Sequence, residues 1–261
     1  MEKRMSAKPD VVLTVCKNYD LLCEEVTKRI LELSRKALET KDCFALALSG
    51  SVTPKGVYTR MASREYHNEF DWHRIHFFWG DERWVPPDHV KSNYRMVAEA
   101  LLTRVDTPIE NIHFVKTKEG SPETSALHYE AELLSFFGLK KGQIPRFDLM
   151  LLGLGVDGHT ASLFPNTAAL AETRRLVVPN DITDVEEPRV TLTFPVINQA
   201  ANVFFLVSGS EKSEILHTVL EGGVRDVLLP AQRVHPKDGT LNWFVDKAAA
   251  SLLTVRASQM I

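Results

Sequence analysis

The sequence predicts an α/β fold: an open, mainly parallel, doubly wound sheet with helices on both faces. Short apolar runs alternate with longer amphipathic segments nearly throughout the chain, as in repeated strand–helix units. The run 147–152 lacks the period-two alternation of a half-exposed strand, so we expect this strand to be covered on both faces. The 261 residues, 44% of them hydrophobic, suffice for one large core. We therefore predict a single domain spanning residues 1–261.

The individual elements follow from periodicity and from capping residues. The expected strands are the apolar runs 11–16, 44–48, 75–79, 112–115, 147–152, 176–178, 190–194 and 203–207. The first helix is expected over 19–40, because Leu22, Val26 and Ile30 recur on one helical face. The other expected helices are 54–64, 93–104, 123–137, 211–221 and 248–254. Gly138 and Gly222 follow two of them as plausible stops.

Composition excludes several functional classes. The chain has 31 Lys+Arg and 34 Asp+Glu, a formal net charge of −3, which is a poor basis for nucleic-acid binding. No apolar stretch approaches the roughly 18 residues needed to span a bilayer, so we expect no membrane partner. The three cysteines form no Cys-x-x-Cys pair, which argues against a zinc site and favours reduced thiols in a cytoplasmic protein.

Open parallel sheets bind ligands beyond the carboxyl ends of their strands, so the loops after residues 48, 79, 152 and 207 are the candidate functional loops. The first contains Ser49, Gly50 and Ser51, and then Thr53 and Pro54. Thr53 suits a helix N-cap and Pro54 the first helical position. A helix N-terminus with free N–H groups favours an anion such as phosphate. The alternative is an ordinary strand-to-helix turn.

The second loop places three charges directly after the strand 75–79. Arg83 offers a planar fork of donors to a phosphate or carboxylate. Asp81 is a candidate to orient a base or to contact a sugar hydroxyl. The alternative is a solvated turn with an internal ion pair.

The third loop, residues 153–160, matches the dinucleotide-binding pattern G-x-G-x-x-G after a strand. Several strand–helix units precede it, however, and Pro165 would cut short the helix that the pattern requires. The preferred interpretation is that its glycines bring backbone N–H groups to a ligand carbonyl and place His159 at the cleft. A His beside Asp157 at a strand end is a natural general base.

The fourth loop holds Lys212, expected in the first turn of the helix 211–221. The helix dipole disfavours a cation there unless an anion is bound. Lys212 is therefore either a phosphate ligand or one exposed lysine among many.

These loops, in this order and spacing, resemble the 6-phosphogluconolactonase family, a branch of the glucosamine-6-phosphate isomerase/deaminase-like superfamily. The resemblance covers nearly the whole chain. Its most specific stretches are 79–85 (WGDERWV), Ser92-Asn93 and 152–165 (LGLGVDGHTASLFP), and 189–193 (RVTLT) adds to it.

The resemblance implies a cytoplasmic, metal-independent hydrolase without a cofactor. It would open 6-phospho-D-glucono-1,5-lactone to 6-phosphogluconate in the pentose phosphate pathway. By position, Asp157 and His159 correspond to the catalytic pair. The positions that correspond to the phosphate and substrate site are Gly50, Arg83, Arg189 and Lys212. Further candidate substrate or phosphate contacts are Ser49, Ser51, Thr53, Asp81, Gly155 and Gly158.

Ser51 departs from the family pattern, which usually has a second glycine there. Its side chain either crowds the phosphate or donates a hydroxyl hydrogen bond to it. The expected partner is a small sugar-phosphate lactone, and the expected state is a monomer or weak dimer.

Two other functions remain as alternatives. An amino-sugar phosphate isomerase/deaminase would carry a carboxylate after the glycine-rich loop, where this chain has residues 162–166 (SLFPN). A sugar-phosphate sensor without turnover would carry a helix-turn-helix, for which the expected first strand near Val11 leaves no room.

Overall fold

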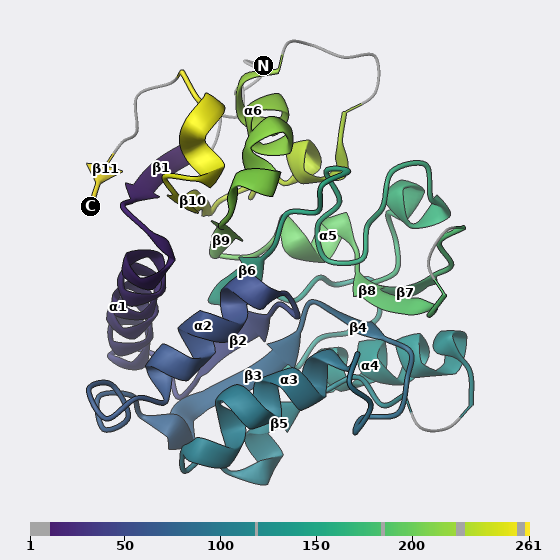
Figure 1. The fold of residues 1–261 in the computed structure, drawn as a ribbon. Helices are drawn as coiled ribbons and strands as arrows, with labels where there is room; N and C mark the ends of the chain where they lie inside the picture. Colours follow the sequence, from purple (N-terminus) through teal and green to yellow (C-terminus); the bar gives the residue numbers. More distant parts are fainter. Residues whose placement is uncertain (1–10, 118–119, 184–185, 223–227, 255–258) are drawn as a thin grey trace, which may run out of the picture.

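The structure is a computed structural model that describes residues 11–117, 120–183, 186–222, 228–254 and 259–261. Its main sheet has eight strands in the order β11-β1-β10-β9-β6-β2-β3-β5, and all its pairings are parallel (Figure 1). The strands are β1 (Val11–Cys16), β2 (Phe44–Leu48), β3 (Ile75–Trp79), β5 (Ile112–His113), β6 (Leu149–Leu152), β9 (Asn202–Val207), β10 (Thr240–Asp246) and β11 (Gln259–Met260). The predicted parallel α/β architecture is confirmed.

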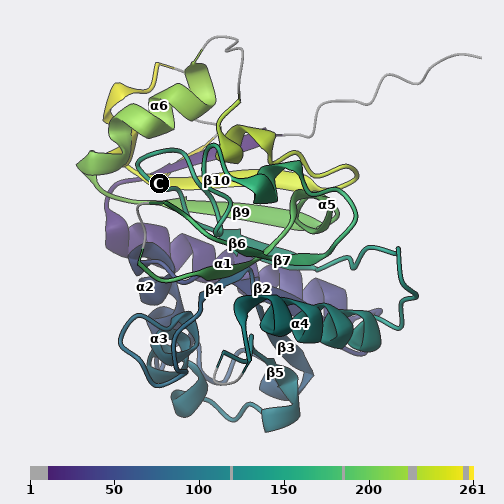
Figure 2. The ribbon, with the colours of Figure 1, turned by 90° about the vertical axis from the view of Figure 1, so that its right-hand side faces the viewer.

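Helices cover both faces of this sheet. They are α1 (Tyr19–Leu38), α2 (Val52–Met61), α3 (Asn93–Ala100), α4 (Pro122–Phe136), α5 (Phe194–Ile197) and α6 (Ser213–Glu221). In Figure 2, α4 lies in front of the main sheet and α1 lies behind it. Two central strands have every residue buried, β2 and β6, as expected for strands covered on both faces.

A second, small sheet corrects the expectation of a single sheet. The segments predicted at 176–178 and 190–194 form β7 (Val177–Asn180) and β8 (Arg189–Leu192), which pair antiparallel with each other. The third strand is β4 (Asp81–Arg83), antiparallel to β8. Residues 81–83, expected as a loop, are therefore an edge strand that is fixed in register against β8.

The sequence interpretation missed β10, which lies between β1 and β9 in the main sheet. Its signal is present: Leu241, Trp243 and Val245 alternate with Thr240 and Asn242. Conversely, the helix predicted at 248–254 is wrong, because only the 3-10 turn Ala249–Leu252 forms there.

Several predicted boundaries also shift. The helix predicted over 93–104 ends at Ala100 and is followed by the 3-10 turn Leu102–Arg104. The helix predicted from 211 begins at Ser213, after the 3-10 turn Ser210–Lys212. The strand predicted to 194 ends at Leu192, because Phe194 begins α5.

The strand order explains why four distant loops can form one site. The strands β9, β6, β2 and β3 are neighbours in the sheet and run in parallel. Their carboxyl ends therefore lie at one edge, and the loops after residues 48, 79, 152 and 207 emerge side by side.

In the described part of the chain, every helix is too short or too polar to cross a bilayer.

Candidate active site

A cavity of about 250 Å³ lies at this edge of the sheet, and all four loops contribute to its wall. The predicted site residues that line it are Ser49, Gly50, Ser51, Asp81, Arg83, Gly155, His159 and Lys212. One imidazole and two cationic side chains thus face the same space. Of the remaining predicted residues, Thr53 lines a neighbouring cavity, whereas Asp157, Gly158 and Arg189 stand outside the lining of the first one.

The glycine loop (residues 153–160) closes on itself through local hydrogen bonds. The Gly155 N–H donates to the His159 carbonyl at 2.9 Å, and the Gly158 N–H donates to the Gly155 carbonyl at 3.0 Å. The Thr160 hydroxyl donates to the Gly153 carbonyl at 2.9 Å. Gly158 has a φ of 83°, a conformation that favours glycine. These contacts make the loop a preformed support for the side chain of His159.

His159 is held by a carboxylate on one side and an aromatic ring on the other. Its Nδ1 lies 2.5 Å from Asp157 Oδ1, and its backbone N–H donates to the same oxygen at 3.1 Å. The imidazole stacks on Phe164, with ring centroids 3.9 Å apart. A carboxylate partner assigns the proton to Nδ1 and leaves Nε2 with a lone pair. Burial raises the pKa of Asp157, but hydrogen bonding and the charge of His159 outweigh it and lower that pKa overall.

The same loop corrects one expectation. The N–H groups of Gly155, Gly158 and His159 donate within the loop, so none of the three is available to a ligand carbonyl. The two glycines are instead required by close packing, because neither position has room for a Cβ. A Cβ at Gly155 would stand 2.1 Å from the His159 Nδ1 atom, and one at Gly158 would stand 3.0 Å from the Leu229 side chain.

The loop also argues against the dinucleotide-binding alternative. That motif opens a helix directly after its glycines. Here Thr160 and Leu163 form an isolated bridge, and the next helical segment is the 3-10 turn Ala168–Ala171. The pattern match therefore lacks the helix that would receive a pyrophosphate.

The serine turn (residues 49–53) connects β2 to α2. Ser51, rather than Thr53, is the N-cap of α2, so Pro54 is the third helical residue rather than the first. A proline is tolerated there because the first N–H groups of a helix have no intrahelical partner. Gly50 is required by close packing, since a Cβ would stand 1.8 Å from the Asn93 Oδ1 atom. The Ser49 N–H donates to the Tyr58 hydroxyl at 2.9 Å, and that hydroxyl donates to the Ser49 carbonyl at 2.8 Å.

The carboxylates of Asp81 and Glu82, which precede Arg83, accept hydrogen bonds from other residues of the protein. Asp81 is buried and accepts a hydrogen bond from the Ser162 hydroxyl at 2.6 Å. The carboxylate of Glu82 accepts from the N–H groups of Asn93 and Tyr94 at the start of α3. Burial raises the pKa of Glu82, whereas these N–H donors lower it, and burial prevails, so that the pKa is about 7. Together these contacts fix the backbone from which Arg83 extends into the cavity.

Arg189 lies directly opposite Arg83 in the pairing of β8 with β4. Within the described residues its Nε and Nη1 atoms are buried and have no hydrogen-bond partner. Burial, followed by the charge of Arg83, lowers the pKa of Arg189. Two arginines in register on adjacent strands, one of them with buried N–H groups that lack a partner, favour the approach of an anion.

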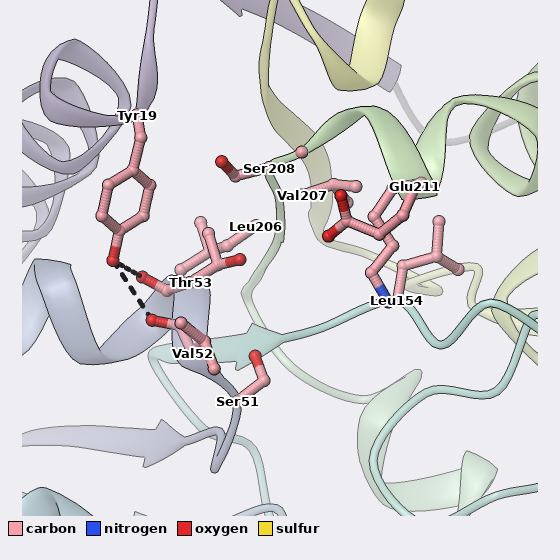
Figure 3. A pocket seen from close by; sticks show the side chains of 11 residues that line it. Tyr19, Ser51, Val52, Thr53, Leu154, Leu206, Val207, Ser208 and Glu211 are labelled. Atoms are coloured by element: carbon pink, nitrogen blue, oxygen red, sulfur yellow. Dashed lines mark hydrogen bonds between the residues drawn. The ribbon is translucent and has the colours of Figure 1, made fainter.

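Lys212 lies at the end of the 3-10 turn Ser210–Lys212 and is the N-cap of α6. Its loop is anchored to the carboxyl end of β10, where Asp246 accepts from the Ser208 hydroxyl at 2.5 Å and from the Gly209 N–H at 3.2 Å. Lys212, Ser51 and Leu154 also line a second cavity of about 420 Å³ (Figure 3). Lys212 therefore stands at the junction of two adjoining cavities.

Sequence reasoning missed several residues of the wall. Asn93, Val156 and Ala161 line the smaller cavity, and Tyr19 lines the larger one. Asn93 was part of the Ser92-Asn93 stretch that carries the family resemblance, but its place behind Gly50 depends on the packing of α3. Ala161 has a φ of 48°, which is uncommon for a residue with a Cβ.

Among the described residues, no group of three or more His, Cys, Asp or Glu side chains is arranged to hold a metal ion. The cavity is lined by the imidazole of His159, by Ser51 at the start of α2 and by the cationic side chains of Arg83 and Lys212. This combination can hold a phosphorylated ligand and move a proton beside it.

Comparisons with known proteins agree with this chemistry. Residues 17–243 match the family model described as glucosamine-6-phosphate isomerases/6-phosphogluconolactonase. The chain is 39% identical over 255 residues to a 6-phosphogluconolactonase of Nostoc, covering 98% of this chain and all of that one. It is 40% identical to a 6-phosphogluconolactonase of Synechocystis, covering 95% and 99% of the two chains. A solved 6-phosphogluconolactonase from Trypanosoma cruzi superposes with a TM-score of 0.84 at 31% identity, covering 97% and 100%.

Proposed function

The chain belongs to the family of glucosamine-6-phosphate isomerases and 6-phosphogluconolactonases, and on this premise we propose that it hydrolyses 6-phospho-D-glucono-1,5-lactone with His159 as general base. The product is 6-phospho-D-gluconate, formed in the pentose phosphate pathway. We further propose that a single domain, residues 1–261, carries this activity in the cytoplasm as a monomer or weak dimer. The expected partner is the lactone alone, without a cofactor or nucleic acid.

One observation supports this proposal most directly: His159 lines the same cavity as Arg83 and Lys212. A lactone that carries a phosphate needs both a cationic end and a proton acceptor within one site. Residues 162–166 (SLFPN) also contain no carboxylate, whereas an amino-sugar isomerase/deaminase is expected to carry one after the glycine-rich loop.

The phosphate is held by cations and by a helix N-terminus. Arg83 and Lys212 supply positive charge, and the start of α2 at Ser51 adds free N–H groups and the positive end of the helix dipole. Arg189, opposite Arg83 in the pairing of β8 with β4, adds a further positive charge. Fixing the phosphate orients the ester carbonyl toward His159, which converts binding into positioning.

The chemistry follows from the protonation state of the imidazole. Asp157 holds the Nδ1 proton, so Nε2 accepts a proton from a water molecule as that water attacks the carbonyl carbon. The bond between the carbonyl carbon and the ring oxygen then breaks, and His159 returns the proton to that oxygen. The N–H groups of Gly155, Gly158 and His159 donate within the loop, so they do not stabilise the developing oxyanion.

The proposal is tested by the hydrolysis of fresh 6-phosphogluconolactone, coupled to 6-phosphogluconate dehydrogenase, in the presence of a chelator. The wild type should turn over the lactone with the chelator present. His159→Ala should lose about 100-fold or more in kcat, as is usual for a positioned acid or base. Near-native turnover by this variant would remove His159 from its role.

Lys212→Ala tests the proposed binding of the phosphate, as His159→Ala tests the proposed base. It should mainly raise KM, because phosphate contacts are made equally in the ground and transition states. An unchanged KM would exclude Lys212 from phosphate binding. Release of ammonia from glucosamine 6-phosphate would favour the isomerase/deaminase branch instead.

A further inference from the structure

Tyr19 reaches from the first turn of α1 to the start of α2, where the phosphate is proposed to bind. Its hydroxyl donates to the Val52 carbonyl at 3.1 Å and to the Thr53 carbonyl at 3.2 Å (Figure 3). The tyrosine lines the larger cavity together with Ser51 and Lys212. It is absent from the lining of the smaller cavity, which contains His159.

The helix α2 is shaped to receive this phenol. A Cβ at Gly56 would stand 2.1 Å from the Tyr19 hydroxyl oxygen and 2.7 Å from the Cys23 sulfur. A glycine inside a helix costs about 1 kcal/mol relative to alanine. Gly56 therefore lowers helix stability at a position where a Cβ would displace the Tyr19 hydroxyl.

One of the two hydrogen bonds, that to the Val52 carbonyl, bears directly on an anion-binding group. A peptide unit is planar and trans, so its C=O and N–H point in opposite directions. Fixing the Val52 carbonyl thus fixes the N–H of Thr53, which belongs to the same peptide unit. Because Pro54 has no N–H, the free donors in this first turn are those of Val52 and Thr53.

Tyr19 keeps its proton over the physiological range. Burial, and then the neighbouring Cys23, raises the pKa of Tyr19 above its ordinary value. The hydroxyl therefore remains a donor to both carbonyls at any pH at which the enzyme would work.

From this geometry we propose that Tyr19 is a positioning residue for the phosphate site: its hydroxyl, for which Gly56 leaves room, orients the Thr53 N–H of α2 toward the phosphate. The proposal rests on the proposed function for the identity of the ligand. Tyr19 and His159 line different cavities, so we expect the effect of Tyr19 to fall on phosphate binding and not on the chemical step.

The test is Tyr19→Phe in the full chain, with two readouts. The Kd of inorganic phosphate, measured by protein-observed NMR titration, should rise about 5- to 10-fold, the loss expected for one or two neutral hydrogen bonds. The KM for the lactone should rise in parallel, while kcat stays within about twofold of the wild type.

Tyr66→Phe is the matched control. Its hydroxyl donates to Glu24 on α1 at 2.9 Å, so the variant also removes a phenol hydrogen bond to the α1 region but leaves residues 51–54 untouched. It should bind phosphate as the wild type does. A Tyr19→Phe variant that binds phosphate no more weakly than Tyr66→Phe would overturn the inference.

Gly56→Ala is a second, independent perturbation. Alanine raises helix propensity, but its Cβ would displace the Tyr19 hydroxyl. The inference predicts a rise in phosphate Kd similar to that of Tyr19→Phe, and unchanged or tighter phosphate binding would contradict it. Since phosphate binding is measured without turnover, failure of the lactonase assay would refute the proposed function and leave this test intact.

Discussion

The glycine loop and the serine turn lie side by side at the same sheet edge, yet they are held in place in opposite ways. The glycine loop is bonded to itself: Gly155, Gly158 and Thr160 all use partners within residues 153–160. The serine turn is held from outside, by Tyr58 at its start, by Asn93 behind Gly50, and by Tyr19 at Val52 and Thr53.

On the proposed function, this difference separates the positioning of the catalytic side chain from the positioning of the phosphate-binding groups. The glycine loop presents His159 mainly through its own hydrogen bonds, with added contacts from Phe164, which stacks on the ring, and from the Ala231 N–H, which donates to the Gly158 carbonyl at 3.0 Å. A turn held by distant side chains couples phosphate binding to the packing of α1 and α3. Substitutions in the glycine loop should therefore change kcat with little loss of stability, whereas those in the serine turn should change binding and stability together.

Gly155→Ala should have the largest effect. The new Cβ would displace the His159 ring, a side chain that can move, rather than the backbone. We expect kcat to fall about 100-fold, as for a small misplacement of a catalytic group, with only a minor change in Tm. Steady-state kinetics and thermal unfolding of one preparation check both parts. A large drop in Tm would contradict the view of a self-supporting loop.

Asp157→Asn should reduce kcat by about 10- to 100-fold, because the amide no longer holds the Nδ1 proton and stabilises the imidazolium less. The folded-state pKa of Asp157 lies below its ordinary value. Its ionised form therefore stabilises the wild type above its unfolded pKa, and this contribution is lost as pH falls through the folded pKa. The difference in Tm between variant and wild type should shrink in that acidic window. A difference that stays constant with pH would disprove this linkage.

Gly50→Ala tests the other region of the comparison, the serine turn. The Cβ would collide with the buried Asn93 amide, whose Nδ2 donates to the Asp81 carbonyl at 2.8 Å. We expect about 1–3 kcal/mol of lost stability and about a 10-fold rise in KM. Gly80→Ala is the control at the same edge, because its Cβ meets nothing closer than 3.4 Å. Equal effects of the two variants would show that close packing at Gly50 is not the cause.

Ser51→Gly should have the smallest effect and decides the role of the residue that departs from the family pattern. Ser51 caps α2 without a side-chain hydrogen bond, and glycine at an N-cap costs only a few tenths of a kcal/mol. If its hydroxyl donates to the phosphate, KM should rise about two- to threefold. A lower KM would mean that the side chain crowds the phosphate instead.

Local pattern was enough to predict much of this site. Asp157 and His159 are two residues apart, so their contact needs no long-range information. The alternation of strands and helices predicted a parallel sheet, and parallel strands necessarily bring their following loops to one edge. The candidate loops after residues 48, 79, 152 and 207 follow from that rule alone.

Local pattern was insufficient wherever a partner lies far along the chain. The segment 81–83 becomes a strand only because β8 pairs with it, and that pairing sets Arg189 opposite Arg83. Asp246 holds the loop of Lys212 only because β10 lies beside β9 in the sheet. Neither fact is visible in the residues that surround Arg83 or Lys212.

By itself, the sequence predicted the fold class, the contact of Asp157 with His159 and the order of the candidate functional loops, because periodicity and turn chemistry act between near neighbours. The tertiary structure alone decided which strands pair, which glycines are closely packed and which distant tyrosines and amides contact the serine turn. These choices depend on burying one shared core, and the free energy of that burial depends on the whole arrangement rather than on any one segment.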